Sequence, residues 1–147
     1  MKSPVTDICD LNRELPPGAP DAPQWLVDAL QVPREEGWVN SDGCDVHFFR
    51  WGDPANPPLL LMHGFLAHAR CMAFIAPFLA EQYHVIAYDL SGMGDSGVRS
   101  SYPDAVRAQE VVDVARETGL FDHAIKPIVI AHSYGGHVGL ALSLIHI

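Results

Sequence analysis

A single serine stands where an apolar run ends and a glycine-rich segment begins. Residues Ile130–Gly136 read Ile-Ala-His-Ser-Tyr-Gly-Gly, a pattern typical of a tight turn from a strand into a helix. Such a turn would lift the Ser133 hydroxyl above the sheet edge, and the small residues Ala131 and Gly135 would let its two arms approach closely. Free N–H groups at the start of the helix would suit a developing negative charge. The pattern therefore predicts a nucleophile at Ser133.

A second candidate segment follows another apolar run. Leu59–Met62 is followed by His63-Gly64, and a loop at this place can aim a backbone N–H at a substrate carbonyl oxygen. Together with the N–H of Tyr134, that group would form an oxyanion hole. His63 itself is expected to anchor the loop, because a lone histidine is more often structural than catalytic.

A third segment resembles a dinucleotide-binding motif. Gly92–Gly97 fits the pattern Gly-x-Gly-x-x-Gly after a strand. However, Val98–Pro103 carries no apolar stripe, so no helix opens at this loop. The acidic residue about 20 positions further on, Glu117, lies in an amphipathic helix and not after a second strand. The sequence therefore argues against a nucleotide site.

Composition excludes several classes of function. The chain has 147 residues, of which 48% are hydrophobic, enough for the core of one compact domain. Its net charge of −9 disfavours binding to the phosphate backbone of nucleic acid. Cys9, Cys44 and Cys71 form no disulfide or zinc pattern, so a reducing cytoplasm is expected. Nothing in the sequence points to a metal or an organic cofactor.

Neither end of the chain predicts export or membrane insertion. Met1–Asp7 lacks the apolar core of a secretory signal, and the apolar run Val138–Ile147 is shorter than the roughly 20 residues that a bilayer requires. We therefore expect a soluble cytoplasmic protein that acts on a small molecule and contacts neither nucleic acid nor membrane. The sequence leaves its oligomeric state open.

Strand-like and helix-like segments alternate after a first hairpin. Asp42-Gly43 between two strand-like runs predicts a hairpin over Gly37–Trp51. Apolar runs predict three buried strands, at Leu59–Met62, His84–Asp89 and Pro127–His132. Helices are predicted at Pro23–Gln31, at Cys71–Gln82 with Pro77 kinking it or starting its main part, from the capping-box-like Ser101-x-x-Asp104 to Gly119, and from Gly135 onward. The alternation predicts an α/β fold, with a mainly parallel sheet covered by helices on both faces.

Three motifs give the chain its resemblance to a known family. They are His63-Gly64, then Asp89–Ser96 (Asp-Leu-Ser-Gly-Met-Gly-Asp-Ser), then the turn at Ser133. From about residue 38 to residue 141 the chain resembles the N-terminal half of an α/β-hydrolase. The resemblance implies a truncated α/β-hydrolase fold, in which a β-hairpin precedes the parallel part of the sheet.

Two positions distinguish the chain within that family. The middle motif usually reads Asp-x-Arg-Gly-x-Gly-x-Ser, so Ser91 stands where arginine is common, in a loop that is structural in the family. A serine at position 133 disfavours the relatives with an aspartate nucleophile, which are the epoxide hydrolases and haloalkane dehalogenases.

The resemblance implies a mechanism for which this chain holds only some of the parts. Ser133 would attack an acyl carbonyl and form an acyl-enzyme, while the backbone N–H groups of Phe65 and Tyr134 hold the oxyanion. The family's general-base histidine and its acid lie well downstream of the nucleophile, and the chain ends 14 residues after Ser133. We therefore expect a carboxylesterase-like parent enzyme for a small acyl substrate, and a fragment that is inactive alone.

Alternatives within and outside this chemistry stay open. The same fold supports carbon–carbon bond hydrolysis, perhydrolysis and lyase reactions, and a non-catalytic binding protein can keep the fold. His132 and His137 are expected to pack near the turn and not to face the hydroxyl. Asp89 and Asp95 are expected to brace loops, and not to serve as the triad acid.

The chain divides into three expected parts. We expect residues 1–33 to form an arm with a short helix and residues 34–141 to form the hydrolase half-domain. Residues 142–147 are expected to be a non-native scar, left where the gene was cut. The last segment, Leu-Ser-Leu-Ile-His-Ile, is what CTG TCT CTT ATA CAC ATC encodes, a string that resembles a transposase end adapter. Truncation there would leave the strand at Pro127–Ala131 as an exposed sheet edge.

Overall fold

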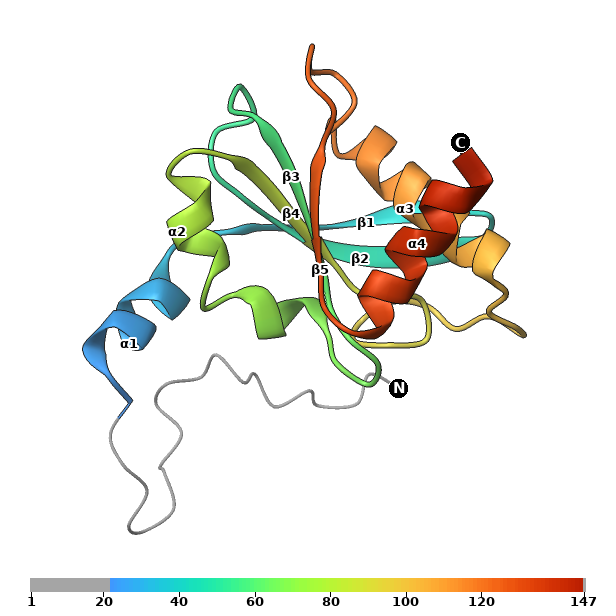
Figure 1. Ribbon diagram of the computed structural model, residues 1–147. Coiled ribbons are helices and arrows are strands. Elements are labelled where there is room, and N and C mark those ends of the chain that lie inside the picture. Colours follow the sequence, from blue (N-terminus) through green and yellow to red (C-terminus); the bar gives the residue numbers. More distant parts are fainter. Residues whose placement is uncertain (1–21, 147) are drawn as a thin grey trace, which may run out of the picture.

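The computed structural model describes residues 22–146 as a five-stranded mixed sheet between two layers of helices (Figure 1). Most of the predicted arm, residues 1–21, lies outside the described residues. The strands lie in the order β1-β2-β4-β3-β5. The elements are α1 (Gln24–Gln31), β1 (Glu35–Ser41), β2 (Cys44–Trp51), β3 (Pro58–Met62), η1 (Ala69–Met72, a 3₁₀ helix), α2 (Ala76–Ala80), β4 (His84–Tyr88), α3 (Asp104–Glu117), β5 (Ile128–Ala131) and α4 (Tyr134–His146).

The hairpin and the parallel strands form as the sequence predicts. Asp42 and Gly43 both have positive φ, 46° and 77°, which is the backbone that a two-residue hairpin turn requires. β1 and β2 pair antiparallel, and β2 pairs antiparallel with β4. β3 pairs parallel with both β4 and β5. The carboxyl ends of these three strands therefore lie at the same end of the sheet, where the lower loops of Figure 1 are drawn.

The side chains of the central strands alternate between two cores. One face packs on α3 and α4 through Leu60, Met62, Ile86 and Tyr88. The opposite face packs on η1 and α2 through Leu59, Leu61, Val85 and Ala87. Since β3 and β4 are buried on both faces, they appear in the sequence as continuous apolar runs. The α/β fold with helices on both faces is confirmed.

Two predicted helices differ from the observed ones. The single helix over Cys71–Gln82 is replaced by η1 and α2, with Pro77 in the first turn of α2, where a missing N–H is tolerated. The capping box at Ser101 is wrong. α3 begins at Asp104, and its N-cap is Pro103, whose extended backbone (φ −66°, ψ 156°) carries no side-chain cap.

β5 is one of the two edge strands of the sheet in this chain, and its side chains are exposed. Ile128, Val129 and Ile130 are 45%, 42% and 48% exposed, so the expectation of a third buried strand is wrong for this chain. A groove of about 660 Å³ runs beside β5, between it, α3 and the segment 121–127. Within residues 22–146, every helix is too short or too polar to cross a bilayer.

The exposed edge predicts self-association of the 147-residue chain. An apolar edge strand offers unpaired N–H and C=O groups to a second chain. A lysine at position 129 would place like charges together across such a pair. We therefore expect Val129→Lys to weaken association at least about tenfold in sedimentation velocity over a concentration series.

Leu140→Lys provides the matched control, since Leu140 is a 67% exposed apolar residue that belongs to α4 and not to the edge strand. It should leave association unchanged. A wild-type chain that stays monomeric at all concentrations, or equal association of the wild type and Val129→Lys, would contradict the prediction.

Candidate active site

Ser133 occupies a strained turn between β5 and α4. β5 ends at Ala131, α4 begins at Tyr134, and Ser133 between them has a φ of 52°. A positive φ is uncommon for a residue with a side chain, and such conformations persist only where the surroundings enforce them. The serine is exposed. The turn between β5 and α4 lies at the lower end of the sheet in Figure 1.

The loop after β3 lies directly against this turn. A Cβ added at Gly64 would lie 2.9 Å from His132 Nδ1 and 3.3 Å from the Cβ of Ser133. On the other arm, a Cβ at Gly135 would lie 2.7 Å from the carbonyl oxygen of His63. Ala131, two residues before the serine, pairs in register with Met62 of β3. The segments around residues 63 and 133 therefore fit together only because glycines stand at the contact.

The two candidate oxyanion residues are neighbours. The rings of Phe65 and Tyr134 meet edge to face, with centroids 5.8 Å apart. Each follows the contact directly, Phe65 after Gly64 and Tyr134 after Ser133. Among residues 22–146, neither backbone N–H has a hydrogen-bond acceptor. The two residues that carry these amides thus directly follow Gly64 and Ser133, which lie against each other.

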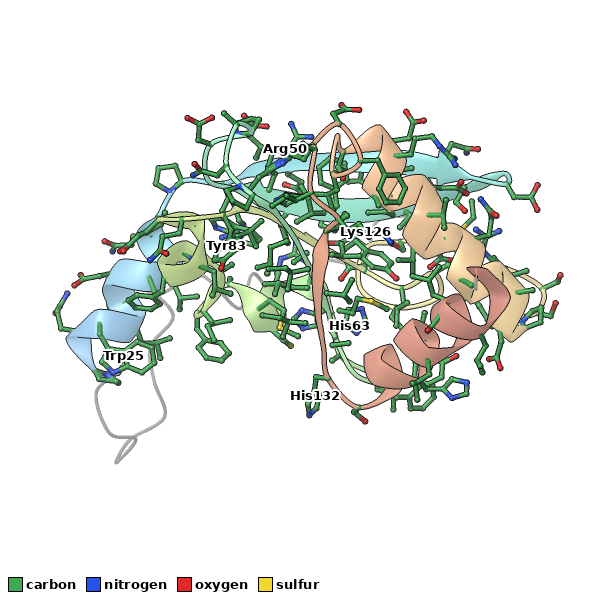
Figure 2. All side chains as sticks on the ribbon, turned by 45° about the horizontal axis from the view of Figure 1, so that its top comes forward. Trp25, Arg50, His63, Tyr83, Lys126 and His132 are labelled. Carbon is green, nitrogen blue, oxygen red and sulfur yellow. The ribbon has the colours of Figure 1, made fainter. Side chains whose placement is uncertain are left out.

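His63 is fixed below the loop by both ring nitrogens. Its Nδ1–H donates to the carbonyl oxygen of Gly64 (2.7 Å), because Nε2 accepts from the N–H of Leu90 (3.1 Å). The ring is fully buried, and burial lowers its pKa below the ordinary value. Figure 2 shows His63 and His132 at the same end of the strands. A neutral imidazole with both nitrogens occupied suits an anchor and leaves no base for Ser133.

Asp89 organises the neighbouring loop. Its carboxylate accepts hydrogen bonds from His47 Nδ1 (2.8 Å) and from the backbone N–H groups of Ala69 and Asp95. Burial raises the pKa of Asp89, but the hydrogen bonds outweigh this effect and hold the pKa below its usual range. This carboxylate therefore braces three segments of chain.

One group of side chains could in principle hold a metal ion. Ligand atoms of Glu36, His47 and Asp95 lie within 4.8 Å of one another. However, His47 Nε2 already pairs with Glu36 (2.8 Å), and Asp95 pairs with Arg70. These ion pairs account for the group without a metal.

A buried ion cluster stands where the family usually has an arginine. The Ser91 hydroxyl donates to Glu110 Oε2 (2.6 Å), and Arg107 Nη1 donates to the carbonyl oxygen of Ser91 (2.9 Å). Arg99 Nε also reaches Glu110 (3.2 Å). None of the sequence motifs predicted this cluster. It could have been predicted from the helical spacing of residues in α3. Arg107 and Glu110 share the buried stripe of that helix with Val111 and Val114.

The nearby histidines do not serve Ser133. His132 is exposed beside Gly64, and His137 is stacked on Tyr134 with 17° between the rings. His137 Nε2 instead pairs with Asp104 (3.0 Å). Among the described residues, none hydrogen-bonds the Ser133 side chain.

The geometry agrees with a sequence-family match. The model of the "Alpha/beta hydrolase family" matches residues 59–147, which include His63-Gly64 and the Ser133 turn. The chain belongs to the alpha/beta hydrolase family. It is 27% identical over 105 residues to "Uncharacterized hydrolase YugF" of Bacillus subtilis, covering 70% of this chain and 37% of that protein.

Two further relatives carry more specific names. "Epoxide hydrolase A" of Mycobacterium tuberculosis is 30% identical over 115 residues, with 76% of this chain and 34% of that protein covered. A solved structure of a bacterial membrane phospholipase A superposes with a TM-score of 0.69 at 32% identity, covering 77% of this chain and 36% of that one. The chain thus spans little more than a third of the length of these relatives.

The contact at Gly135 predicts a steric test. Gly135→Ala places a methyl group against the backbone of His63 and Met62, so we expect a loss of about 1–3 kcal/mol in the free energy of unfolding. Gly136→Ala is the matched control, because apart from the neighbouring backbone of its own helix no described atom lies within 4 Å of its added Cβ. It should be neutral or stabilising by up to about 1 kcal/mol. Urea unfolding measures both; equal effects would refute the close contact.

The position of His47 predicts a pH-dependent stability. Burial lowers its pKa, but the hydrogen bonds and charges of Asp89 and Glu36 outweigh this and raise it. A raised pKa contributes stability that is complete below the unfolded value of about 6.5 and is lost as pH rises through the folded value. His47→Gln should therefore cost about 1–3 kcal/mol near pH 5.5 and less near pH 9.

Urea unfolding of the wild type and His47→Gln at both pH values measures this difference. His137→Gln serves as the control, because His137 and Asp104 form an ion pair more than half exposed, which should contribute little. If the loss in free energy of unfolding caused by His47→Gln stays constant or grows as the pH rises, the raised pKa of His47 is contradicted.

Proposed function

We propose that the protein containing this chain is a carboxylesterase-like serine hydrolase that cleaves an ester or related acyl bond of a small molecule. The observation that carries the proposal is Ser133 itself, held at positive φ between β5 and α4 and beside two free amides. A cytoplasmic location is part of the same proposal. The phospholipase A named among the relatives supports ester chemistry on this fold.

In the proposed reaction, Ser133 Oγ bonds to the carbonyl carbon and its proton passes to a general base. The carbonyl oxygen becomes an oxyanion, which the N–H groups of Phe65 and Tyr134 stabilise. Collapse of this intermediate breaks the bond to the leaving group, which takes the proton. Water then hydrolyses the acyl-enzyme in the reverse sense. The amino end of α4 adds a favourable dipole at the oxyanion.

The base and its orienting acid belong to the rest of the protein in this proposal. His63 is occupied on both nitrogens, and His137 pairs with Asp104. Since the relatives are almost three times as long as the matched segment, they have room for the missing residues downstream. The 147-residue chain is accordingly expected to be inactive by itself.

Serine at position 133 favours acyl transfer over epoxide opening. "Epoxide hydrolase A" is a relative, but the resemblance assigns an aspartate nucleophile to such enzymes, and Ser133 cannot form the same ester intermediate. Carbon–carbon bond hydrolysis, perhydrolysis, a lyase reaction and a non-catalytic role stay possible outcomes of the experiment below.

A fluorophosphonate probe on the full-length protein tests the proposal. We expect covalent labelling of Ser133, detected by mass spectrometry of the modified peptide, and its complete loss in Ser133→Ala. Ser101→Ala, at another exposed serine, should label like the wild type. No labelling of a folded full-length protein would overturn the serine hydrolase and favour the binding protein. Labelling without turnover of p-nitrophenyl esters would favour the non-ester reactions.

A further inference from the structure

A buried arginine of α3 reaches the residue that follows Ser133. The Cζ of Arg107 lies 5.8 Å from the ring centroid of Tyr134 and 4.5 Å from that of Tyr102. At both distances a guanidinium is attracted to an aromatic ring. Figure 1 shows α3 alongside α4, of which Tyr134 is the first residue. Arg107 therefore links α3 to the turn that carries the candidate nucleophile.

The loop after β4 holds this guanidinium in place. Arg107 Nη1 donates to the carbonyl oxygen and to the Oγ of Ser91, each at 2.9 Å, and pairs with Glu110 Oε1 at 3.4 Å. Ser91 and Glu110 are both fully buried. Charge-assisted hydrogen bonds to buried partners are strong and directional. The guanidinium is thus fixed independently of its contact with Tyr134.

The replacement of the family's usual arginine by Ser91 fits this arrangement. Arg99 Nε and Arg107 Nη1 both donate to the Ser91 hydroxyl, at 3.1 and 2.9 Å, and both side chains pair with Glu110. An arginine at position 91 would add a third positive charge beside one buried carboxylate, which is unfavourable. In this chain, a residue of α3 therefore supplies a guanidinium to the loop.

The other polar and aromatic contacts of the Tyr134 ring lie nearer the surface. Phe65, whose ring meets it edge to face, is exposed, and His137, stacked on it at 5.7 Å, pairs with the exposed Asp104. Exposed ion pairs contribute little to stability. The partly buried ring also packs on the apolar core. Arg107 adds a buried, directional contact to this packing.

We propose that Arg107 is a positioning residue for the hydrolase reaction. By fixing the Tyr134 ring, it holds the Tyr134 backbone N–H where the oxyanion forms. The inference rests on the proposed function, because it requires this amide to act in the oxyanion hole. Tyr134 is the first residue of α4, where backbone N–H groups have no partner within the helix. Misplacing such a donor is costly, since it must lie about 2.7–3.1 Å from the developing charge.

The kinetics of fluorophosphonate labelling of the full-length protein test this inference. An oxyanion hole acts in the transition state more than in binding. We therefore expect Arg107→Gln to lower the maximal labelling rate about tenfold and to change the half-saturating probe concentration less than about twofold. Arg99→Gln is the matched control, because Arg99 also pairs with Glu110 but its described contacts do not include Tyr134. It should label within about twofold of the wild-type rate.

A double-mutant cycle tests whether Arg107 acts through the ring. Tyr134→Leu removes the ring and keeps the backbone N–H. In that background, Arg107→Gln should change the labelling rate less than about twofold, because the contact is already lost. Arg107→Lys keeps the charge without the planar group that reaches both Ser91 and the ring. This second variant, which serves if Arg107→Gln does not fold, should label at least about threefold more slowly than the wild type.

The possible outcomes separate this inference from the proposed function. Labelling of Arg107→Gln or Arg107→Lys at the wild-type rate would overturn the inference. Equal losses in Arg99→Gln and Arg107→Gln would also overturn it, as would a tenfold loss that persists in the Tyr134→Leu background. Absence of labelling in the wild type would overturn the proposed function, and this inference with it. Labelling of the wild type with any of the preceding results would overturn this inference alone.

Discussion

The close contact between two loops at the carboxyl ends of β3 and β5 is the constraint on which the candidate site depends. Gly135 lies against the carbonyl oxygens of Met62 and His63, and Gly64 lies against His132 and Ser133. A side chain at Gly135 would collide with the backbone of residues 62 and 63, and one at Gly64 would press on the side chains of His132 and Ser133. Because they fit closely, Ser133 is held at positive φ and the amides of two distant segments adjoin it.

Buried charges hold the loops around this contact. Asp89 ties the segments of His47, Ala69 and Asp95 together, and Glu110 of α3 receives both the hydroxyl and the N–H of Ser91. Such networks are stable only when their members are paired, because a lone buried charge is strongly unfavourable. The loops at this end are therefore fixed by electrostatics as well as by packing, which keeps the candidate site preorganised.

Both ends of the sheet hold buried polar atoms without a partner among residues 22–146, which at the Ser133 end include Tyr88 Oη and Arg107 Nε. At the Ser133 end, the histidine and carboxylate anchors have partners inside the chain. At the other end, His84 and the Nε of Arg50 have none among residues 22–146. The β5 edge exposes apolar side chains and unpaired strand backbone, to which another chain could bind.

The sequence by itself determined the hairpin, the buried strands β3 and β4, the α/β class and the turn at Ser133. These features depend on local signals, which are Asp42-Gly43, the apolar runs and the small residues beside a serine. It did not locate the start of α3, where Pro103 replaced the expected cap. Only the tertiary structure brought Arg107 and Glu110 to Ser91, and Arg50 to His84. Contacts between residues far apart in the chain follow from strand order and helix packing, which no local pattern encodes.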